Sequence, residues 1–223
     1  MWKYLWNARE ISPETTFSHN GYAFETDEKY QRFIQQVCMH LPLHHGDAVL
    51  DVGCGNGSFF HHLCQQRKVT TVRLDGFDFC TKSIQYAKEH YVGTFREGDA
   101  GEVLPFKDDS FDVLVCVCVL QYLPNKDKSL DLLREIKRVV KPSGSILLGN
   151  CLDQDKRELA NRLREGGDYL PGNLQYLTKQ DILGIFPTAQ FVDAIDMDLD
   201  FYDGQEYKFS AYVTPCLGVG VEK

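Results

Sequence analysis

The chain has 223 residues, 43% of them hydrophobic, which is enough for one full core but too few for two ordinary domains and a linker. Acidic residues outnumber basic ones by 32 to 24, and the resulting net charge of −8 repels phosphate backbones. Length, composition and charge therefore favour a single domain with a small-molecule ligand over a nucleic-acid-binding protein.

The sequence shows no signal for membrane insertion or for secretion. Its first residues, MWKYLW, lack the apolar core and cleavage site of a signal peptide. The longest apolar run, 113–120, is far shorter than the ~20 residues that a membrane-spanning helix needs. The eight cysteines are scattered without a CxxC pair, so we expect reduced, buried side chains. We predict a cytoplasmic protein that does not insert into membranes.

Short apolar runs alternate with helical patterns, which is typical of βαβ units and a parallel sheet. In chain order, the predicted elements are a helix at 26–41, a strand at 48–50, a helix at 58–67, a strand at 72–77, a helix at 81–90, strands at 94–95 and 111–119, a helix at 129–140, a turn at 141–144, a strand at 146–148, a charged helical stretch at 155–164, and strands at 191–198 and 207–213. The last two strands alternate apolar and polar residues, as paired antiparallel strands do. The sheet is therefore predicted to be mostly parallel with an antiparallel finish.

A glycine-rich turn follows the first predicted strand, in the segment 49–57 with the sequence VLDVGCGNG. Glycines at such a turn allow positive φ angles and a close approach of backbone to ligand. The spacing is GxGxG rather than the GxGxxG of dinucleotide-binding proteins. Asp51, just before the turn, is awkward for a pyrophosphate but suits a ligand with an ammonium and a sulfonium group. A tight turn without any ligand is the alternative interpretation.

Two further acids follow the next two predicted strands. Asp78 could accept hydrogen bonds from both hydroxyls of a ribose, although alone it also fits a solvated loop acid or a helix cap. Thr81 is the better placed cap. Asp99 could accept a hydrogen bond from an adenine amino group, although alone it would more often be a turn residue. The order of turn, ribose acid and adenine acid along the chain favours a nucleoside-containing ligand.

These segments resemble the class I S-adenosylmethionine-dependent methyltransferases. The likeness is greatest to the group called methyltransferase type 11, which includes quinone-biosynthesis, natural-product and sugar methyltransferases. It runs from about residue 46 to residue 148, and its motifs are the turn at 49–57, Asp78, the segment 98–100, the stretch 104–115 and the stretch 134–144. The chain departs from the family at Ser143, where glycine is usual, and at Gln121-Tyr122, where the group often has a histidine.

The resemblance implies an α/β fold, a Rossmann-like seven-stranded, mostly parallel sheet with helices on both faces and an antiparallel last strand. It also implies S-adenosylmethionine as the cofactor, with S-adenosylhomocysteine as the product of direct displacement. The predicted cofactor-binding residues are Asp51, Gly53, Cys54, Gly55, Asn56, Gly57, Asp78, Phe79, Asp99, Ala100, Cys116 and Gln121. The predicted catalytic residues are Tyr122, near the transferable methyl in relatives, and His19, in a segment that often folds over the cofactor.

The acceptor is predicted to be a small molecule with an O, N or C nucleophile. The fourth strand is not followed by Asn/Asp-Pro-Pro-Tyr, which speaks against methylation of nucleobase or side-chain amide nitrogens. We predict one domain over 1–223, with a helical cap at 1–45, the cofactor-binding core at 46–151 and acceptor-side elements at 152–223. Within it, residues 2–24 and 152–180 are expected to cover the site, with Tyr122, Tyr169 and Tyr176 as candidate linings.

Two other functions stay open. An NAD-dependent oxidoreductase is disfavoured by the glycine spacing and by Asp51, and a catalytically silent interaction module of the same fold is disfavoured by the intact cofactor motifs. No metal is expected at His40 and His44, because Pro42 breaks the helix between them.

Overall fold

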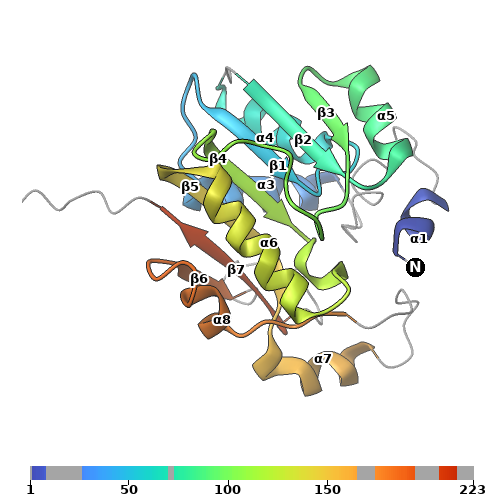
Figure 1. The fold of residues 1–223 in the computed structure, drawn as a ribbon, viewed down its shortest axis with the longest axis vertical. Helices are drawn as coiled ribbons and strands as arrows, with labels where there is room; N and C mark the ends of the chain where they lie inside the picture. The colour runs from blue at the N-terminus through green and yellow to red at the C-terminus, as the bar shows by residue number, and fades with distance from the viewer. Residues whose placement is uncertain (1, 9–26, 70–72, 165–173, 194–205, 215–223) are drawn as a thin grey trace, which may run out of the picture.

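The computed structural model describes residues 2–8, 27–69, 73–164, 174–193 and 206–214. Its centre is a seven-stranded sheet in the order β3-β2-β1-β4-β5-β7-β6 (Figure 1). The strands are β1 (Ala48–Val52), β2 (Arg73–Asp78), β3 (Thr94–Glu97), β4 (Phe111–Val117), β5 (Val140–Leu152), β6 (Gln190–Asp193) and β7 (Lys208–Val213). The pairs among β1 to β5 are parallel, and β7 runs antiparallel to both of its neighbours. The predicted fold class is confirmed.

Helices cover both faces of the sheet. They are α1 (Trp2–Ala8), α3 (Asp27–His40), α4 (Ser58–Arg67), α5 (Thr81–His90), α6 (Lys126–Val139), α7 (Arg157–Arg164) and α8 (Lys179–Leu183), with the short 3₁₀ turns η2 (Leu120–Tyr122) and η3 (Gln154–Lys156). In Figure 1, α6 lies in front of the sheet, and α3 and α4 lie behind it. When helices cover both faces of a strand, the side chains on both faces are buried, and its sequence is a nearly continuous apolar run. This explains the sequence of β4.

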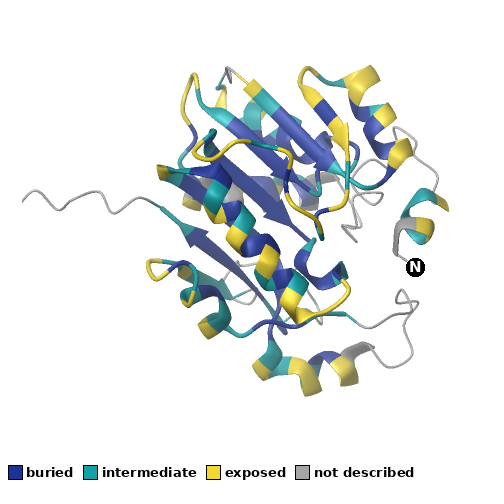
Figure 2. Cartoon of the chain, in the orientation of Figure 1, coloured by how far each residue is buried: buried dark blue, intermediate teal, exposed yellow. Residues whose placement is uncertain are grey.

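Two hydrophobic clusters fill the space between the sheet and its helices. Phe33 of α3 and Phe60 of α4 pack against one face of the central strands. Leu133 of α6 and Ile182 of α8 belong to the cluster on the other face. Figure 2 shows the consequence, with buried central strands and helices that are exposed only on their outer sides. The core therefore fixes β1, β2 and β4 as a rigid platform.

The start of α6 differs from the prediction. Helical periodicity predicted a start at residue 129, whereas the helix begins at Lys126. Asn125 provides the N-cap, because its side chain accepts a hydrogen bond from the backbone N–H of Lys128 at 2.9 Å. The three additional residues lie in a polar first turn that an apolar pattern does not reveal.

The predicted turn at 141–144 is wrong, because β5 begins directly at Val140. Phe111 pairs with Val140 and Val113 pairs with Ser145, so the intervening residues of β5 form a bulge alongside β4. Lys141 holds this bulge in place, since its Nζ lies 2.7 Å from the carboxylate of Asp112.

The tail follows the prediction where the structure describes it. β6 and β7 pair antiparallel, and residues 194–198 of the predicted strand lie outside the described residues. The charged stretch at 155–164 forms η3 and α7. No helix in the described ranges is long and apolar enough to cross a membrane. The cysteines whose side chains the structure describes are free thiols, namely Cys54, Cys64, Cys80, Cys116, Cys118 and Cys151.

The topology of the sheet creates one place at its edge where a ligand can bind. The chain leaves β1 toward α4 on one face, whereas it leaves β4 toward α6 on the other face. Because β1 and β4 are neighbours, their connections diverge and open a crevice at the carboxyl ends of the strands. The glycine-rich turn follows β1 at this edge, Asp78 is the last residue of β2, and Tyr122 follows β4.

Candidate active site

The glycine-rich turn joins β1 to α4 in a conformation that requires glycine. Gly53, Gly55 and Gly57 have φ angles of 76°, 52° and 82°, all in the left-handed region. The backbone N–H groups of Gly53 and Cys54 donate to the carbonyl oxygen of Phe77 at 2.7 and 3.2 Å. At Gly53 a Cβ atom would lie 2.1 Å from Cγ2 of Val119, so the turn lies directly against the end of β4.

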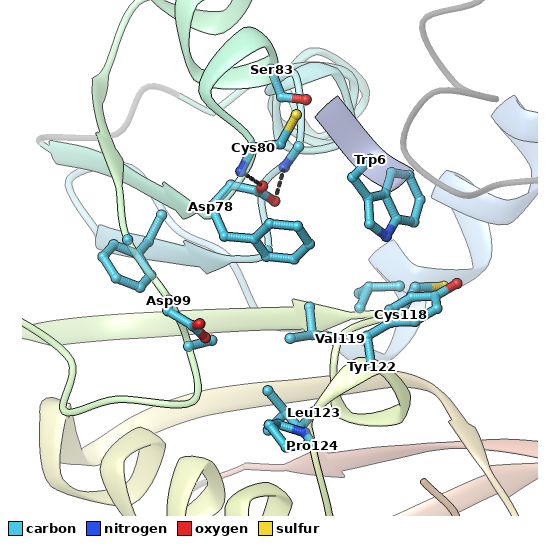
Figure 3. Close-up of a pocket in the computed structure, with 17 residues that line it drawn as sticks. Trp6, Asp78, Cys80, Ser83, Asp99, Cys118, Val119, Tyr122, Leu123 and Pro124 are labelled. Carbon is cyan, nitrogen blue, oxygen red and sulfur yellow. Dashed lines mark hydrogen bonds between the residues drawn. The ribbon is translucent and has the colours of Figure 1, made fainter. Parts of the chain in front are cut away.

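Asp78 is tied to this turn. Its Oδ2 accepts a hydrogen bond from the N–H of Gly55 at 3.0 Å, and its Oδ1 accepts one from the N–H of Cys80 at 2.7 Å (Figure 3). Burial raises the pKa of Asp78, and the hydrogen bonds from these backbone N–H groups act in the opposite direction. The carboxylate therefore lies between the glycine turn and the start of α5, with its orientation fixed from both sides.

Asp51 lies within β1 rather than in the turn and is 4% exposed. Its Oδ2 has no hydrogen-bond partner in the structure. Burial, together with the negative charge of Asp78, raises the pKa of Asp51 to about 8. The charge of Asp78 thus disfavours the ionisation of Asp51, and a positively charged group nearby would favour the ionised form of Asp51.

A pocket opens in front of the turn, at the carboxyl edge of the sheet (Figure 3). Its lining combines the carboxyl ends of the four strands β1 to β4 with residues of α1, α5 and η2 and of the loop after η2. The lining residues are Trp6, Gly53, Gly55, Phe77, Asp78, Phe79, Cys80, Ser83, Gly98, Asp99, Ala100, Val117, Cys118, Val119, Tyr122, Leu123 and Pro124.

Part of the predicted site lines this pocket. The predicted cofactor-binding residues found in the lining are Gly53, Gly55, Asp78, Phe79, Asp99 and Ala100, and the predicted catalytic residue found there is Tyr122. Asp99 is held in a tight turn, since its Oδ1 accepts a hydrogen bond from the N–H of Gly101 at 2.8 Å. Direct cofactor contact by these residues stays a prediction.

Other predicted residues lie behind the lining. Cys54 packs with Ile84 and Phe95 in a cluster under α5, and Gly57 faces Tyr91 and Phe95, where a Cβ would lie 3.0 and 3.2 Å away. These two positions shape the turn from its buried side and do not face the pocket.

Asn56, Cys116 and Gln121 are buried as well. Asn56 Oδ1 accepts a hydrogen bond from the N–H of Ser58 at 3.1 Å and so starts α4. Cys116 belongs to the core cluster on the α6 face of the sheet, where Leu133 and Ile136 also lie. Gln121 is 5% exposed, and its backbone carbonyl accepts a hydrogen bond from the N–H of Gln175.

The predicted catalytic residue His19 and the candidate lining residue Tyr169 lie outside the described residues. Tyr176, the other candidate lining residue, packs with Leu152, Ala160 and Tyr207 in a separate cluster. Its ring also lies under the guanidinium of Arg157, 5.2 Å from the ring centroid. Tyr176 is therefore not among the residues that line the pocket.

Trp6 and Cys118 are lining residues that the motifs did not identify. Trp6 comes from α1, which lies beside α5, and the Cys80 thiol donates to Oδ1 of Asn7 at 3.6 Å. The rings of Trp6 and Tyr122 meet edge to face, with centroids 5.7 Å apart and an interplanar angle of 79°. The aromatic N-terminal sequence was the only signal for this contact.

Cys118 directly follows β4 and has a φ angle of 59°, which is strained for a residue with a side chain. Its partner across the sheet, Asn150, has a φ angle of 55° and donates from Nδ2 to the Cys118 sulfur at 3.2 Å. Burial raises the pKa of the Cys118 thiol, so this sulfur is neutral at physiological pH. Strained residues of this kind cluster at functional sites.

Comparison with known proteins agrees with this geometry. A family model described as a methyltransferase domain matches residues 43–194, which is more than half of the chain. The chain belongs to the class I S-adenosylmethionine-dependent methyltransferases. The cofactor of this methyltransferase family is S-adenosylmethionine. A solved complex between the Haloferax volcanii Trm112 methyltransferase activator and a methyltransferase has a similar fold, with a TM-score of 0.64 at 20% identity, covering 85% of this chain and 91% of that chain.

Two curated relatives show the range of acceptors within the family. The 27-O-demethylrifamycin SV methyltransferase of Amycolatopsis mediterranei is 29% identical over 145 residues, which cover 60% of this chain and 51% of the relative. The tRNA U34 carboxymethyltransferase of Nautilia profundicola is 26% identical over 142 residues, which cover 60% of this chain and 44% of the relative. The chain thus spans about half the length of the curated relatives it matches.

The pocket suits the chemistry of this family's cofactor. The cofactor combines an adenosine with a methionine that carries a sulfonium and an ammonium group. Two carboxylates in the lining, Asp78 and Asp99, can accept hydrogen bonds, while Phe79, Ala100 and Leu123 offer apolar surface. The partnerless, buried Oδ2 of Asp51 lies behind the turn and would gain from a nearby positive charge. Among the described residues, no three His, Cys, Asp or Glu side chains are grouped so as to hold a metal ion.

Proposed function

We propose that this protein transfers a methyl group from S-adenosylmethionine to an O, N or C nucleophile of a small-molecule acceptor by direct displacement. S-adenosylhomocysteine is the second product. The observation that carries the proposal is the composition of the pocket described above. Asp78 and Asp99 lie on one side, and the rings of Trp6 and Tyr122 lie on the other (Figure 3).

Each side of the pocket has its own task in this proposal. Asp78 accepts hydrogen bonds from the ribose hydroxyls, and Asp99 accepts one from the adenine amino group. The backbone of Gly53 and Gly55 allows the methionine part to approach closely, because neither residue has a side chain. When bound, the cofactor supplies an electrophilic methyl carbon on a sulfonium.

The other side of the pocket positions the acceptor and excludes water. Displacement at a methyl carbon mostly requires that the nucleophile be held in line at roughly 3 Å. Trp6 of α1 and Tyr122 of η2 narrow the pocket from two directions, and the Tyr122 hydroxyl can orient a nucleophile or take part in moving its proton. His19 stays a candidate for the same task from outside the described residues.

The two alternatives are less well supported. A dinucleotide-dependent oxidoreductase would have to place a pyrophosphate at the glycine turn beside Asp78, whose carboxylate would repel it. A catalytically silent module would have no use for a pocket lined by both acids and aromatic rings. A small-molecule acceptor is favoured over tRNA by the net charge of −8, although a relative named for tRNA makes tRNA a necessary arm of the test.

Transfer of a radioactive methyl group tests the proposal. The protein is incubated with methyl-labelled S-adenosylmethionine and, separately, with a metabolite extract, with tRNA and with no acceptor. We expect label in the small-molecule fraction, no label in tRNA, and loss of the transfer in the Asp78→Ala variant. Label only in tRNA would contradict the acceptor class, and no transfer despite cofactor binding would favour the silent module.

A further inference from the structure

The half of the pocket next to the end of β4 has a distinct composition. Its walls are the indole of Trp6 and the phenol ring of Tyr122, with Val117 and Leu123 beside them. The two lining carboxylates lie elsewhere, Asp99 at the opposite end of the view and Asp78 beside the glycine turn (Figure 3). We call this half, formed by Trp6, Val117, Cys118, Tyr122 and Leu123, the aromatic slot.

Two separate elements hold the walls of the aromatic slot. Tyr122 ends η2, where its backbone N–H donates to the carbonyl oxygen of Val119 at 2.9 Å. The hydroxyl of Ser129 donates to the carbonyl oxygen of Leu120 at 3.1 Å and fixes η2 to α6. Trp6 approaches from α1, which lies beside α5. The rings contact each other edge to face at 79°, so together they form one aromatic surface against which a third ring can pack.

The floor of the aromatic slot is a neutral polar atom. Cys118 lines the pocket, and its sulfur accepts a hydrogen bond from Asn150 Nδ2 at 3.2 Å. Burial raises the pKa of this thiol, so it carries no charge. Both Cys118 and Asn150 hold positive φ angles, and this strain persists only because the surrounding strands fix them. A neutral thiol suits a weakly polar group such as a ring hydroxyl better than an ion.

We propose that the acceptor is an uncharged aromatic compound, such as a phenol, whose ring lies in the aromatic slot against Trp6 and Tyr122. This inference rests on the proposed function and narrows its acceptor class. Aromatic rings gain from offset and edge-to-face contacts beyond the burial of their area. An anionic acceptor would lose its hydration in the slot without finding a cationic partner, because the described lining residues include no Lys, Arg or His.

Methyl transfer from the sulfonium to a phenol is balanced in atoms and in charge. The phenol oxygen forms a bond to the methyl carbon, and the carbon–sulfur bond breaks with its electron pair remaining on sulfur. The phenol proton leaves to water or to a base within reach. The products are an aryl methyl ether, a neutral thioether and one proton, so no oxidant or further co-reactant is needed.

Binding of small probes to the full chain tests the inference without knowledge of the natural acceptor. Calorimetry first establishes that S-adenosylhomocysteine binds. With that ligand saturating, affinities for phenol and for cyclohexanol, which has a similar size but no aromatic ring, are measured by ligand-observed NMR. We expect phenol to bind at least about fivefold more tightly than cyclohexanol. Benzoate, a charged ring, should bind more weakly than phenol.

Pairs of variants distinguish the loss of an aromatic ring from damage to the fold. Trp6→Leu and Tyr122→Leu should each reduce the preference for phenol by about threefold or more, whereas Trp6→Phe and Tyr122→Phe should retain most of it. Tyr4→Leu is the matched control on α1, because Tyr4 is 78% exposed and does not line the pocket. Equal affinity for phenol and cyclohexanol, or a preference that survives both Leu variants, would overturn the aromatic acceptor. Failure of S-adenosylhomocysteine to bind would instead contradict the proposed function itself.

Discussion

Asp78 accepts hydrogen bonds from the N–H groups of Gly55 and Cys80, so a single carboxylate connects the glycine turn to the start of α5. The Asp78→Ala variant should weaken S-adenosylmethionine binding by about 1.5–3 kcal/mol, the loss typical of charge-assisted hydrogen bonds. Titration calorimetry measures this change. Asp131→Ala is the control, because Asp131 is an exposed acid on α6. Unchanged affinity in Asp78→Ala would mean that the ribose binds elsewhere.

Gly55 provides the second test at the residue scale. With its φ of 52°, a branched side chain at this position would strain the backbone. Because Gly55 lines the pocket, the side chain would also occupy space that the ligand needs. The Gly55→Val variant should lose measurable S-adenosylmethionine binding in calorimetry. Gly184→Ala should bind normally, since its φ is −60° and an added Cβ would make only ordinary contacts of 3.5 Å. Binding at full strength in Gly55→Val would restore the interpretation of a tight turn without a ligand.

The raised pKa of Asp51 predicts that the free energy of unfolding depends on pH. Its pKa is about 8 in the folded chain and near 3.8 in the unfolded chain, so between these values the folded state binds the extra proton. The free energy of unfolding therefore falls as the pH rises from about 4 to about 8. Asp51→Asn should remove this part of the slope and stabilise the ligand-free protein at pH 8 by about 1–3 kcal/mol. Urea unfolding at pH 5.5 and pH 8 measures it, and an identical slope in both proteins would contradict the buried acid.

The site could be predicted in part at this scale. Gly53, Gly55, Asp78 and Asp99 were identifiable because each follows a predicted strand, and the ends of parallel strands meet at one edge. Cys116 was placed in the site because it is close to that edge in sequence, but its side chain faces the core. The alternation of side chains along a strand decides this, and a continuous apolar run hides the alternation.

At the scale of elements, α1 brings Trp6 to the pocket from a distant part of the sequence. Deletion of residues 1–24 should reduce methyl transfer by more than about tenfold, because one wall of the pocket is lost and water enters. The thermal unfolding midpoint should fall by less than about 4 °C, since the side chains of α1 that the structure describes, at 4–8, belong to neither sheet-face cluster. Trp6→Leu should reproduce much of the loss. Full activity in the truncated protein would exclude a covering role.

The elements themselves were largely predictable. α4 and α5 begin and end at the predicted residues, because glycine and proline positions and apolar periodicity are local signals. The bulge in β5 was not predictable, since Pro142 and Gly144 are turn formers. The ion pair of Lys141 with Asp112 is a tertiary contact, and it keeps this segment beside β4 as part of the strand. No helix was predicted at 2–8, although residues 2–24 were expected to cover the site, and α1 brings Trp6 into the pocket lining.

At the scale of the whole molecule, the fold makes the pocket and the charge limits its ligands. The sheet order diverges between β1 and β4, and the residues named in the proposal gather at that divergence. The acidic net charge of −8 disfavours polyanionic ligands, whereas a cofactor with a sulfonium and an ammonium group is attracted to a site with Asp51 and Asp78. The identity of the nucleoside cofactor that binds in this pocket therefore decides the proposed function.

Calorimetry with S-adenosylmethionine and with NAD on the full chain tests that identity most directly. We expect binding of S-adenosylmethionine at one site per chain, no measurable binding of NAD under the same conditions, and loss of the S-adenosylmethionine signal in Gly55→Val. Binding of NAD in place of S-adenosylmethionine would contradict the proposed function. Equal binding of S-adenosylmethionine by the wild type and by Gly55→Val would contradict the location of the site at the glycine turn.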